Sequence, residues 1–387
     1  MPAIYPYTRY SGMWTPQAQM QAIGNDTWPT QPNYLWSWGY NAFGQLGLNN
    51  RTNYSSPKQV GALTTWLNVS AGATGSNCIL ATKTDGTLWS WGYNGYGNLG
   101  LGNTTSYSSP KQVGALTTWS KIAAGSGFSL AIKTDGTIWS WGRNNYGQLG
   151  LGNVTYYSSP KQIGALATWL NISAGNGHIL AIKTDGTLWS WGRNNNGQLG
   201  LNNRTNYSSP KQMGALTTWL NVSAGDYCAI AIKTDGTLWS WGYNGFGQLG
   251  LDNTTKYSSP KQVGALTNWL NITAGYRHTL ATKTDGTLWS WGRNNFGQLG
   301  LDNTTYYSSP KQVGALTTWL NIAGGAEHTL AIKIDGTLWS WGYNNNGQLG
   351  LGNLTRYSSP KQVGALTTWL NVAAGFYYSV AIKGSSS

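Results

Sequence analysis

The chain has 387 residues, of which 53 are glycine, 23 tryptophan and 23 tyrosine, while only 9% are charged. Ordinary soluble chains carry about 25% charged residues, so this composition excludes a coiled coil, an acidic disordered tail and a typical helical enzyme. The net charge is +13, but most lysines recur at two repeated positions, Lys58 to Lys361 and Lys83 to Lys383. Positive charge that is spread evenly by repetition keeps a surface soluble and argues against a nucleic-acid partner.

Residues 1–34 differ in composition from the rest of the chain. Thr15 is a good helix N-cap, Pro16 suits the first helical turn and Gly24 suits the helix end, so residues 15–24 predict a short helix. No apolar stretch approaches the roughly 20 residues that a membrane helix needs, and residues 1–10 lack the apolar centre of a secretory signal. We therefore interpret residues 1–34 as a leader or anchor segment and expect no membrane insertion.

A unit of about 50 residues repeats from residue 35 to residue 383. The tetrapeptide Trp-Ser-Trp-Gly begins at Trp36, Trp89, Trp139, Trp189, Trp239, Trp289 and Trp339, with a spacing of 53 residues once and of 50 residues thereafter. Such a period is typical of the blades of a β-propeller. Residues 384–387 are predicted to form a flexible tail.

Each repeat predicts short strands and no helix. In one copy the strands are expected at residues 120–124, 129–133, 137–141 and 158–162. Asp135-Gly136 between the second and third strands is a strong hairpin signal, because both positions tolerate positive φ. Pro160 suits an outer edge strand, where a missing N–H group is tolerated.

The two ends of the array predict how it closes. The chain stops at Lys383, where a further Asp-Gly turn is due, and it begins with Leu35-Trp36-Ser37-Trp38, which the last repeat lacks. We predict an all-β fold, a seven-bladed β-propeller closed by pairing of the N-terminal and C-terminal strands in one blade, which removes exposed sheet edges. An open solenoid is the alternative, and it would leave two unfinished ends.

Three tryptophans per blade are expected to pack between adjacent sheets, and Trp189 is expected to be buried there. Cys78 and Cys228 occupy corresponding positions in repeats three blades apart. Because the Cα atoms of a disulfide lie within about 7 Å of each other, we expect two free thiols.

The sequence offers little for catalysis. His178, His278 and His328 share one repeated position, which favours a structural role, and no cysteine or carboxylate cluster accompanies them. Asp252 and Asp302 supply one carboxylate per loop, which is weak support for calcium. We therefore expect no enzymatic activity, no cofactor and no metal site. The seven Asn-x-Thr patterns fit turn chemistry as well as glycosylation, and we favour turns.

Two resemblances add to this reading. Leu-Trp-Ser-Trp-Gly, Asn-x-x-Gly-Gln-Leu-Gly-Leu, Ser-Pro and Ala-Gly-x-x-His-Thr-Leu-Ala (residues 274–281) resemble the regulator of chromosome condensation repeat. This resemblance implies a seven-bladed propeller with a shared closing blade. That family includes a guanine-nucleotide exchange factor that binds chromatin, but this chain shows neither its wedge-like insertion nor its acidic surface. Ser11-Gly12-Met13-Trp14 and Thr27-Trp28-Pro29 resemble N-terminal segments of tailed-phage structural proteins, which implies a virion component.

The repeats differ from one another at a few positions only. Among the varied positions we predict twelve binding residues, namely Tyr40, Tyr93, Arg143, Arg193, Tyr243, Arg293 and Tyr343 after Trp-Ser-Trp-Gly, and Tyr227, Tyr276, Arg277, Phe376 and Tyr377 after Ala-Gly. Because strands alternate in direction, both groups of loops are predicted on one face, and the uniform Asp-Gly-Thr and Gly-Ala-Leu segments on the other. Tyrosine and arginine are enriched at binding hot spots, so we expect the varied face to bind a host-surface glycan or protein. Neutral drift in exposed loops is the open alternative.

These observations predict a non-enzymatic structural or adhesion component of a tailed-phage virion. Its leader would dock to virion proteins, and its propeller would display the binding face. The alternative is a cytoplasmic protein-interaction scaffold that contacts an anionic partner through its lysines.

Overall fold

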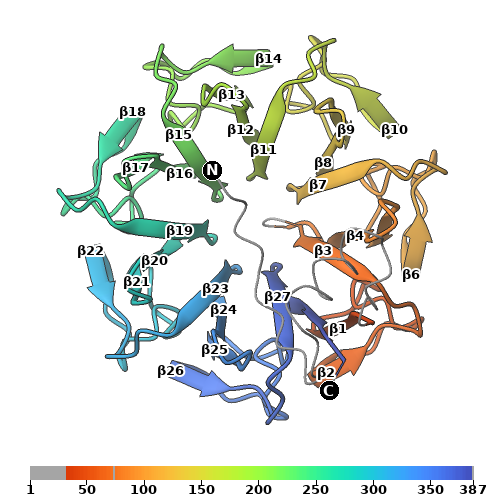
Figure 1. The fold of residues 1–387 in the computed structure, drawn as a ribbon, viewed down its shortest axis with the longest axis vertical. Coiled ribbons are helices and arrows are strands. Elements are labelled where there is room, and N and C mark those ends of the chain that lie inside the picture. Colours follow the sequence, from red (N-terminus) through yellow and green to blue (C-terminus); the bar gives the residue numbers. More distant parts are fainter. Residues whose placement is uncertain (1–31, 73–74, 386–387) are drawn as a thin grey trace, which may run out of the picture.

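The computed structural model describes residues 32–72 and 75–385. In this part of the chain, 28 strands form seven four-stranded antiparallel sheets, and Figure 1 shows these sheets as blades around one central axis. None of the described residues is helical, and none of them belongs to a helix long and apolar enough to cross a membrane. The short helix predicted at residues 15–24 lies outside the described residues.

Each blade runs from its innermost strand at the axis to its outermost strand at the perimeter. The first three blades in chain order are β3 (Trp66–Ala71), β4 (Cys78–Lys83), β5 (Leu88–Gly92) and β6 (Tyr107–Gln112); β7 (Trp119–Ala124), β8 (Phe128–Lys133), β9 (Ile138–Gly142) and β10 (Tyr157–Gln162); and β11 (Trp169–Ala174), β12 (His178–Lys183), β13 (Leu188–Gly192) and β14 (Tyr207–Gln212). The next three are β15 (Trp219–Ala224), β16 (Cys228–Lys233), β17 (Leu238–Gly242) and β18 (Tyr257–Gln262); β19 (Trp269–Ala274), β20 (His278–Lys283), β21 (Leu288–Gly292) and β22 (Tyr307–Gln312); and β23 (Trp319–Gly324), β24 (His328–Lys333), β25 (Leu338–Gly342) and β26 (Tyr357–Gln362).

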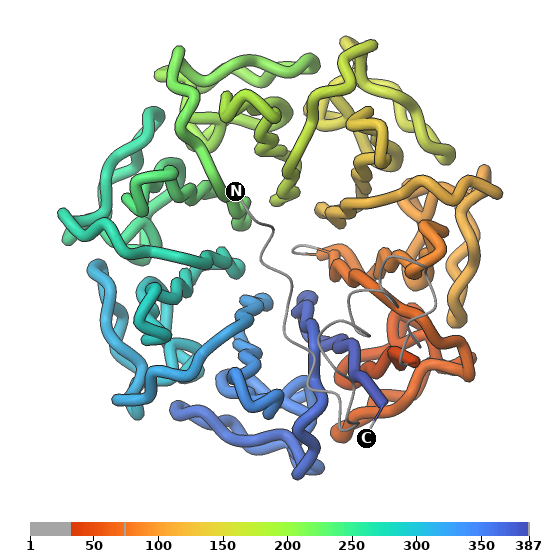
Figure 2. Tube along the Cα trace, viewed as in Figure 1, coloured from red at the N-terminus to blue at the C-terminus, as the bar shows by residue number. Residues whose placement is uncertain are grey.

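The seventh blade joins the two ends of the chain. It contains β27 (Trp369–Ala374), β28 (Tyr378–Lys383), β1 (Tyr34–Gly39) and β2 (Tyr54–Gln59), with β1 between β28 and β2. The strands β1 and β28 pair along their whole length, from Tyr34 opposite Lys383 to Gly39 opposite Tyr378. The predicted closure is thereby confirmed, and Figure 2 shows the first strands meeting the last ones in the ring.

The Asp-Gly hairpins form for the reason that the sequence indicates. The Asp135 carboxylate accepts hydrogen bonds from the backbone N and the hydroxyl of Thr137, at 2.9 and 2.7 Å. Gly136 has a φ of 79°, and a Cβ atom there would lie 2.5 Å from the carbonyl oxygen of Ala167. Only glycine fits this turn without strain, because the next blade approaches its backbone closely.

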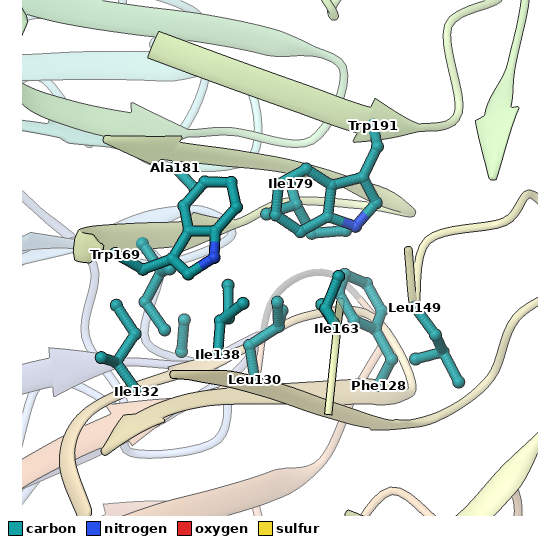
Figure 3. Close-up of a cluster of buried hydrophobic side chains, with 12 residues drawn as sticks. Phe128, Leu130, Ile132, Ile138, Leu149, Ile163, Trp169, Ile179, Ala181 and Trp191 are labelled. Carbon is teal, nitrogen blue, oxygen red and sulfur yellow. The ribbon is translucent and has the colours of Figure 1, made fainter. Parts of the chain in front are cut away.

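Tryptophans fill the space between neighbouring blades, as predicted (Figure 3). The Trp191 side chain is fully buried, and its Nε1 donates to the carbonyl oxygen of Gln148 in the preceding blade at 3.0 Å. The Trp169 ring meets the rings of Trp189 and Trp191 edge-on, each at 6.0 Å between centroids. Such edge-to-face pairs stabilise a core beyond the area that they bury.

The expectation that Trp189 is buried is wrong, because its side chain is only half-buried. Trp189 and Trp191 point to the same side of their strand, but Trp189 lies nearer the end of the blade. Its Nε1 donates to the Thr187 hydroxyl at 2.9 Å, and the Lys183 ammonium lies 3.8 Å from its ring centroid. Trp189 is therefore covered by the side chains of its own hairpin, and Trp191 by the neighbouring blade.

Candidate functional site

The propeller has two faces with different loops, which we call the varied rim and the uniform rim. The varied rim consists of the loops between the first and second strands and between the third and fourth strands of each blade. These two loops meet in every blade; in one of them, for example, the backbone N of Arg193 donates to the carbonyl oxygen of Gly177 at 2.7 Å. The uniform rim consists of the Asp-Gly-Thr hairpins and the Gly-Ala-Leu linkers between blades. The hairpins contact the linkers, as in the hydrogen bond from the backbone N of Trp219 to the carbonyl oxygen of Gly186 at 3.1 Å.

Buried asparagines hold the long loops of the varied rim in place. The Asn144 side-chain amide donates to the carbonyl oxygens of Asn153 and Thr155, at 3.0 and 2.9 Å, while its Oδ1 accepts the backbone N–H of Leu149 at 2.9 Å. Equivalent bonds from Asn344 reach Asn353, at 3.0 Å. The residues that vary between blades are therefore carried on similar, internally bonded loops, which keeps their side chains in order before any partner binds.

The varied rim holds all twelve residues that the sequence predicted as binding residues. Each of these twelve side chains is half-buried: Tyr40, Tyr93, Arg143, Arg193, Tyr227, Tyr243, Tyr276, Arg277, Arg293, Tyr343, Phe376 and Tyr377. Their position on one face follows from the strand order, whereas their binding role remains a prediction.

One arc of the rim is mainly aromatic. The Phe43 ring lies 6.4 Å from Tyr40 and 5.2 Å from Tyr93, and Tyr93 lies 6.0 Å from Tyr96. The Arg143 guanidinium lies 5.3 Å from the Tyr96 ring centroid. This arc therefore connects the closing blade to the two blades that follow it in the chain.

A second aromatic arc is formed by residues 276–377, near the end of the chain, and includes loops next to the propeller axis. The Phe376 ring lies 6.4 Å from Tyr276 and 4.2 Å from Tyr377. The Tyr343 ring lies 5.3 Å from Tyr377 and 4.8 Å from Phe296. These rings come from three neighbouring blades, so one partner could contact all of them at once.

Four arginines of the varied rim each lie over two aromatic rings, and Arg293 is one of them, at 5.5 Å from Phe246 and 5.9 Å from Phe296. We call the other three, which form no ion pair, the stacked arginines. The Arg193 guanidinium lies 4.8 Å from the ring centroids of both Tyr146 and Tyr227. Arg277 lies 4.8 Å from Phe246 and 4.4 Å from Tyr276, and Arg356 lies 4.8 Å from both Phe296 and Tyr343. Contact with aromatic faces stabilises a guanidinium and fixes its orientation.

Arg293 differs from the stacked arginines because it has a carboxylate partner. Its Nη1 donates to Oε1 of Glu327 at 2.6 Å, and Gln298 donates to Oε2 of the same carboxylate at 2.7 Å. Glu327 is buried, and this burial raises the pKa of its carboxyl group to about 7 despite the nearby Arg293 and Arg277. The folded protein therefore holds the Glu327 proton more tightly than the unfolded chain does.

This raised pKa predicts a pH effect on stability. Between about pH 4.5 and pH 7 the folded state binds more protons at Glu327 than the unfolded state, so the Glu327 contribution to stability falls as the pH rises. In Glu327→Gln this pH-dependent loss is absent. We expect the unfolding midpoint of the variant to rise relative to the natural chain from pH 5 to pH 7.5, measured by thermal unfolding in matched buffers. A constant difference across this range would contradict the prediction.

Sequence reasoning missed several residues of the rim. Five aromatic side chains occupy one position of the long loop, namely Phe43, Tyr96, Tyr146, Phe246 and Phe296. Their signal was visible, because five of seven copies place an aromatic residue where the other two have asparagine. Glu327 lies at one of the positions that vary after Ala-Gly, but its partner Arg293 belongs to another loop, as does Phe296 beside Arg356.

The hollow at the axis of the varied rim is too small to hold a ligand by itself. It measures about 40 Å³ and is lined by Tyr276, Phe376, Asp226 and the glycines of the inner loops. Sites for small molecules usually measure about 300–1,000 Å³. A larger hollow of about 370 Å³ lies at the seam of the closing blade, between Trp36 and Leu351. The varied rim is therefore a surface for contact rather than a deep pocket.

The histidines have structural contacts in the core. His278 and His328 are buried, and their Nε2 atoms lie 3.3 and 3.0 Å from the hydroxyls of Thr329 and Ser379 in the next blade. Burial lowers the pKa of both, to about 4 and about 3, so both are neutral at pH 7.

No group of three or more metal-ligating side chains occurs within residues 32–72 and 75–385. Cys78 and Cys228 are buried free thiols, as expected.

The third histidine lacks this hydroxyl and suggests a stabilising substitution. Both ring nitrogens of His178 are buried without a side-chain partner, and Ala229 occupies the position that Thr329 and Ser379 occupy in later blades. In Ala229→Ser a hydroxyl would reach His178, and we expect the free energy of unfolding to rise by about 0.5–1.5 kcal/mol. Urea unfolding checks this result, with Ala229→Val as the control that fills the space without a hydroxyl. Equal effects of both substitutions would contradict the hydrogen-bond explanation.

The uniform rim carries alternating charges and exposed leucines. Lys183 lies over Trp189, and Asp185 is exposed in the same hairpin. Leu170 is 51% exposed because it lies at a register shift in β11, between Trp169 and Asn171. The same exposed position is leucine in six of the seven innermost strands. Burial in the core does not explain why these leucines are so uniform.

The closed ring of seven four-stranded sheets defines a seven-bladed β-propeller. A model of the RCC1-like domain matches residues 35–381, and the chain therefore belongs to this family. Segments of the chain are similar to Ultraviolet-B receptor UVR8 of Arabidopsis thaliana, at 36% identity over 84 residues, and to Protein RCC2 of Homo sapiens, at 40% over 85 residues. These segments cover 22% of this chain but only 19% and 16% of those two relatives.

Two solved structures show the same fold over nearly the whole chain. Prp20p from Saccharomyces cerevisiae is 23% identical and has a TM-score of 0.82. The match covers 92% of this chain and 93% of the Prp20p chain. Human WBSCR16 is 22% identical and has a TM-score of 0.81, and the match covers 91% of this chain and 99% of the WBSCR16 chain. At these identities the likeness establishes the architecture, and the partners of those proteins are not carried over.

Proposed function

We propose that this chain is a non-enzymatic recognition propeller that binds a macromolecular partner through its varied rim. The observation that supports this most is the contrast between the rims, because near-identical repeats differ where Tyr, Phe and Arg side chains gather. Those side chains are half-buried and held by neighbouring rings, so little side-chain entropy is lost when a partner binds. The solved structure of Prp20p is described together with its binding to Gsp1p and histones, which shows that this fold can carry protein recognition.

The finer proposal is that the propeller is part of a tailed-phage virion and recognises the host surface. It is supported by the sequence of the leader, whose residues 1–31 lie outside the described residues. Mass spectrometry of purified particles and of the host lysate tests this location. We expect the protein in the particles, and we expect a chain without residues 1–31 to fold but to be absent from them. Recovery from the lysate alone would contradict the virion proposal.

The second candidate is a cytoplasmic scaffold for an anionic partner, and one observation favours it. The outer strands carry exposed lysines such as Lys111, Lys211 and Lys311, and none of them has a carboxylate partner among the described residues. Binding through such lysines weakens steeply with salt. Replacing Lys111, Lys211 and Lys311 by glutamine therefore separates this candidate from recognition through the varied rim, because only lysine-mediated binding would be lost.

Binding to arrays of glycans and of surface proteins tests the role of the varied rim. Tyr276, Arg277 and Tyr377 lie together near the axis, and we expect their combined replacement by alanine to reduce binding by about 100-fold or more, as for hot-spot residues. The matched control replaces the exposed Leu216, Leu220 and Leu266 of the uniform rim by alanine. Loss of binding in the control, with binding retained in the first variant, would reverse the assignment of the two rims.

A further inference from the structure

None of the three stacked arginines forms an ion pair with a described carboxylate. The ion pair between Arg293 and Glu327 is the one such pair within the part of the chain that the structure describes. Arg193, Arg277 and Arg356 form no ion pair with a described carboxylate, although Glu327 is near enough to Arg277 to interact with its charge. Aromatic rings hold all three in a fixed orientation. A guanidinium that is ordered before binding loses little conformational freedom when an anion arrives.

The hydrogen-bonding edges of these guanidiniums are largely unused. Arg277 donates from Nη2 to the Tyr276 hydroxyl at 2.8 Å, and Arg356 donates from Nε to Oδ1 of Asn345 at 3.1 Å. The Arg193 guanidinium donates no hydrogen bond to any described residue, and its Nε is buried without a partner. The Nε atoms of Arg193 and Arg277 are buried without a partner, so an incoming acceptor has to pair with the terminal Nη1 and Nη2 groups. Two parallel N–H groups in one plane match the two oxygens of a carboxylate.

We propose that the varied rim binds a carboxylate-bearing polysaccharide, with one carboxylate at each stacked arginine. This inference rests on the proposed function, because it takes the varied rim as the binding face. The three arginines come from three different blades, so a polymer with several carboxylates can contact more than one of them. Tyr156 and Tyr306 on the same rim are 44% and 43% exposed and offer rings to the apolar faces of sugars. Tyr306 lies 5.9 Å from Phe246, the ring under Arg277. Asparagine side chains of the same loops, such as the exposed Asn145, can bind hydroxyl groups.

Arginine and lysine variants of the full chain test this proposal at constant net charge. The test variant carries Arg193→Lys, Arg277→Lys and Arg356→Lys, which keeps each charge but removes the planar pair of donors. The control carries Arg51→Lys and Arg204→Lys, two exposed arginines of the same kind of loop that lie over no aromatic ring of the described residues. The probes are polygalacturonate, which has one carboxylate per sugar, its methyl ester, which has none, and poly-L-glutamate.

We expect the natural chain and the control to bind polygalacturonate equally, and neither to bind the methyl ester. The test variant should bind polygalacturonate at least about tenfold more weakly, as when charge-assisted paired hydrogen bonds are lost. Unfolding midpoints verify that the variants fold, and the single Arg356→Lys at an exposed site replaces the triple variant if it does not.

Three results would overturn the inference. Equal binding by the test variant would mean that charge alone attracts the polymer. Binding of poly-L-glutamate as tightly as polygalacturonate would point to an acidic polypeptide, and no binding of polygalacturonate would exclude this class of ligand. The alanine variant of Tyr276, Arg277 and Tyr377 distinguishes these results from failure of the proposed function. If it still loses binding on the arrays, the varied rim remains the binding face and only the ligand class is wrong.

Discussion

Replacing Trp191 by alanine is expected to lower the free energy of unfolding by about 3–5 kcal/mol, as for other large side chains removed from a core. The side chain is fully buried in the core cluster that also contains Ile163, Ile179 and Leu149, and it donates a hydrogen bond to the preceding blade. Alanine would leave a cavity at the blade interface, and the Gln148 carbonyl oxygen would lose the hydrogen bond that it accepts from Trp191. Both changes weaken the contact between two blades rather than the sheet of one blade.

Trp189→Ala is the matched control, because it removes the same side chain two residues earlier in the same strand. Trp189 is half-buried and covered by its own hairpin, so we expect a smaller loss than for Trp191. Urea unfolding followed by tryptophan fluorescence and by circular dichroism measures both variants. Equal losses would show that position relative to the neighbouring blade does not decide the contribution of these tryptophans.

The architecture of the molecule could be predicted because the same strand and turn pattern occurs seven times in the sequence. The repeat period indicates blades, and the missing hairpin after Lys383 together with the strand that begins at Leu35 indicates closure. These signals are local in the chain, since turns and alternation depend on near neighbours. The burial of Trp189 could not be predicted in this way, because alternation fixes the face of a side chain and not how far the next blade extends over it.

The candidate site was predictable only in part, for a related physical reason. Comparison of the copies located the varied loops and residues such as Arg193 and Arg277. The stacking of Arg193 on Tyr146 and Tyr227 joins three different blades, and no pattern within one repeat encodes it. The pairing of Arg293 with Glu327 is of the same kind, since the two residues are 34 positions apart. Contacts between blades depend on the geometry of the ring, which appears only when the ring is closed.

Deleting residues 1–40 is expected to abolish the stable fold, because it removes the strand that closes the ring. The loss includes the complete pairing of β1 with β28 and the fully buried side chains of Leu35 and Trp38. Domains are stable by only about 5–15 kcal/mol, and this deletion removes a sheet strand together with one side of two blade interfaces. β28 would then present an unpaired edge, which favours aggregation. Size-exclusion chromatography and limited proteolysis would show aggregated and cleavable protein.

The deletion of residues 1–31 is the control, because it ends just before the residues that close the ring. Asn33 remains in this variant, and its side chain donates to the carbonyl oxygen of Trp66 at 3.2 Å. We expect this shorter deletion to elute and unfold like the full chain.

A synthetic peptide of residues 32–41, added during refolding, should partly restore protease resistance to the longer deletion, because it supplies the strand in trans. The opposite result would be a chain without residues 1–40 that stays monomeric and keeps its unfolding midpoint. It would show that the six complete blades are sufficient for stability and that strand pairing in the closing blade contributes little.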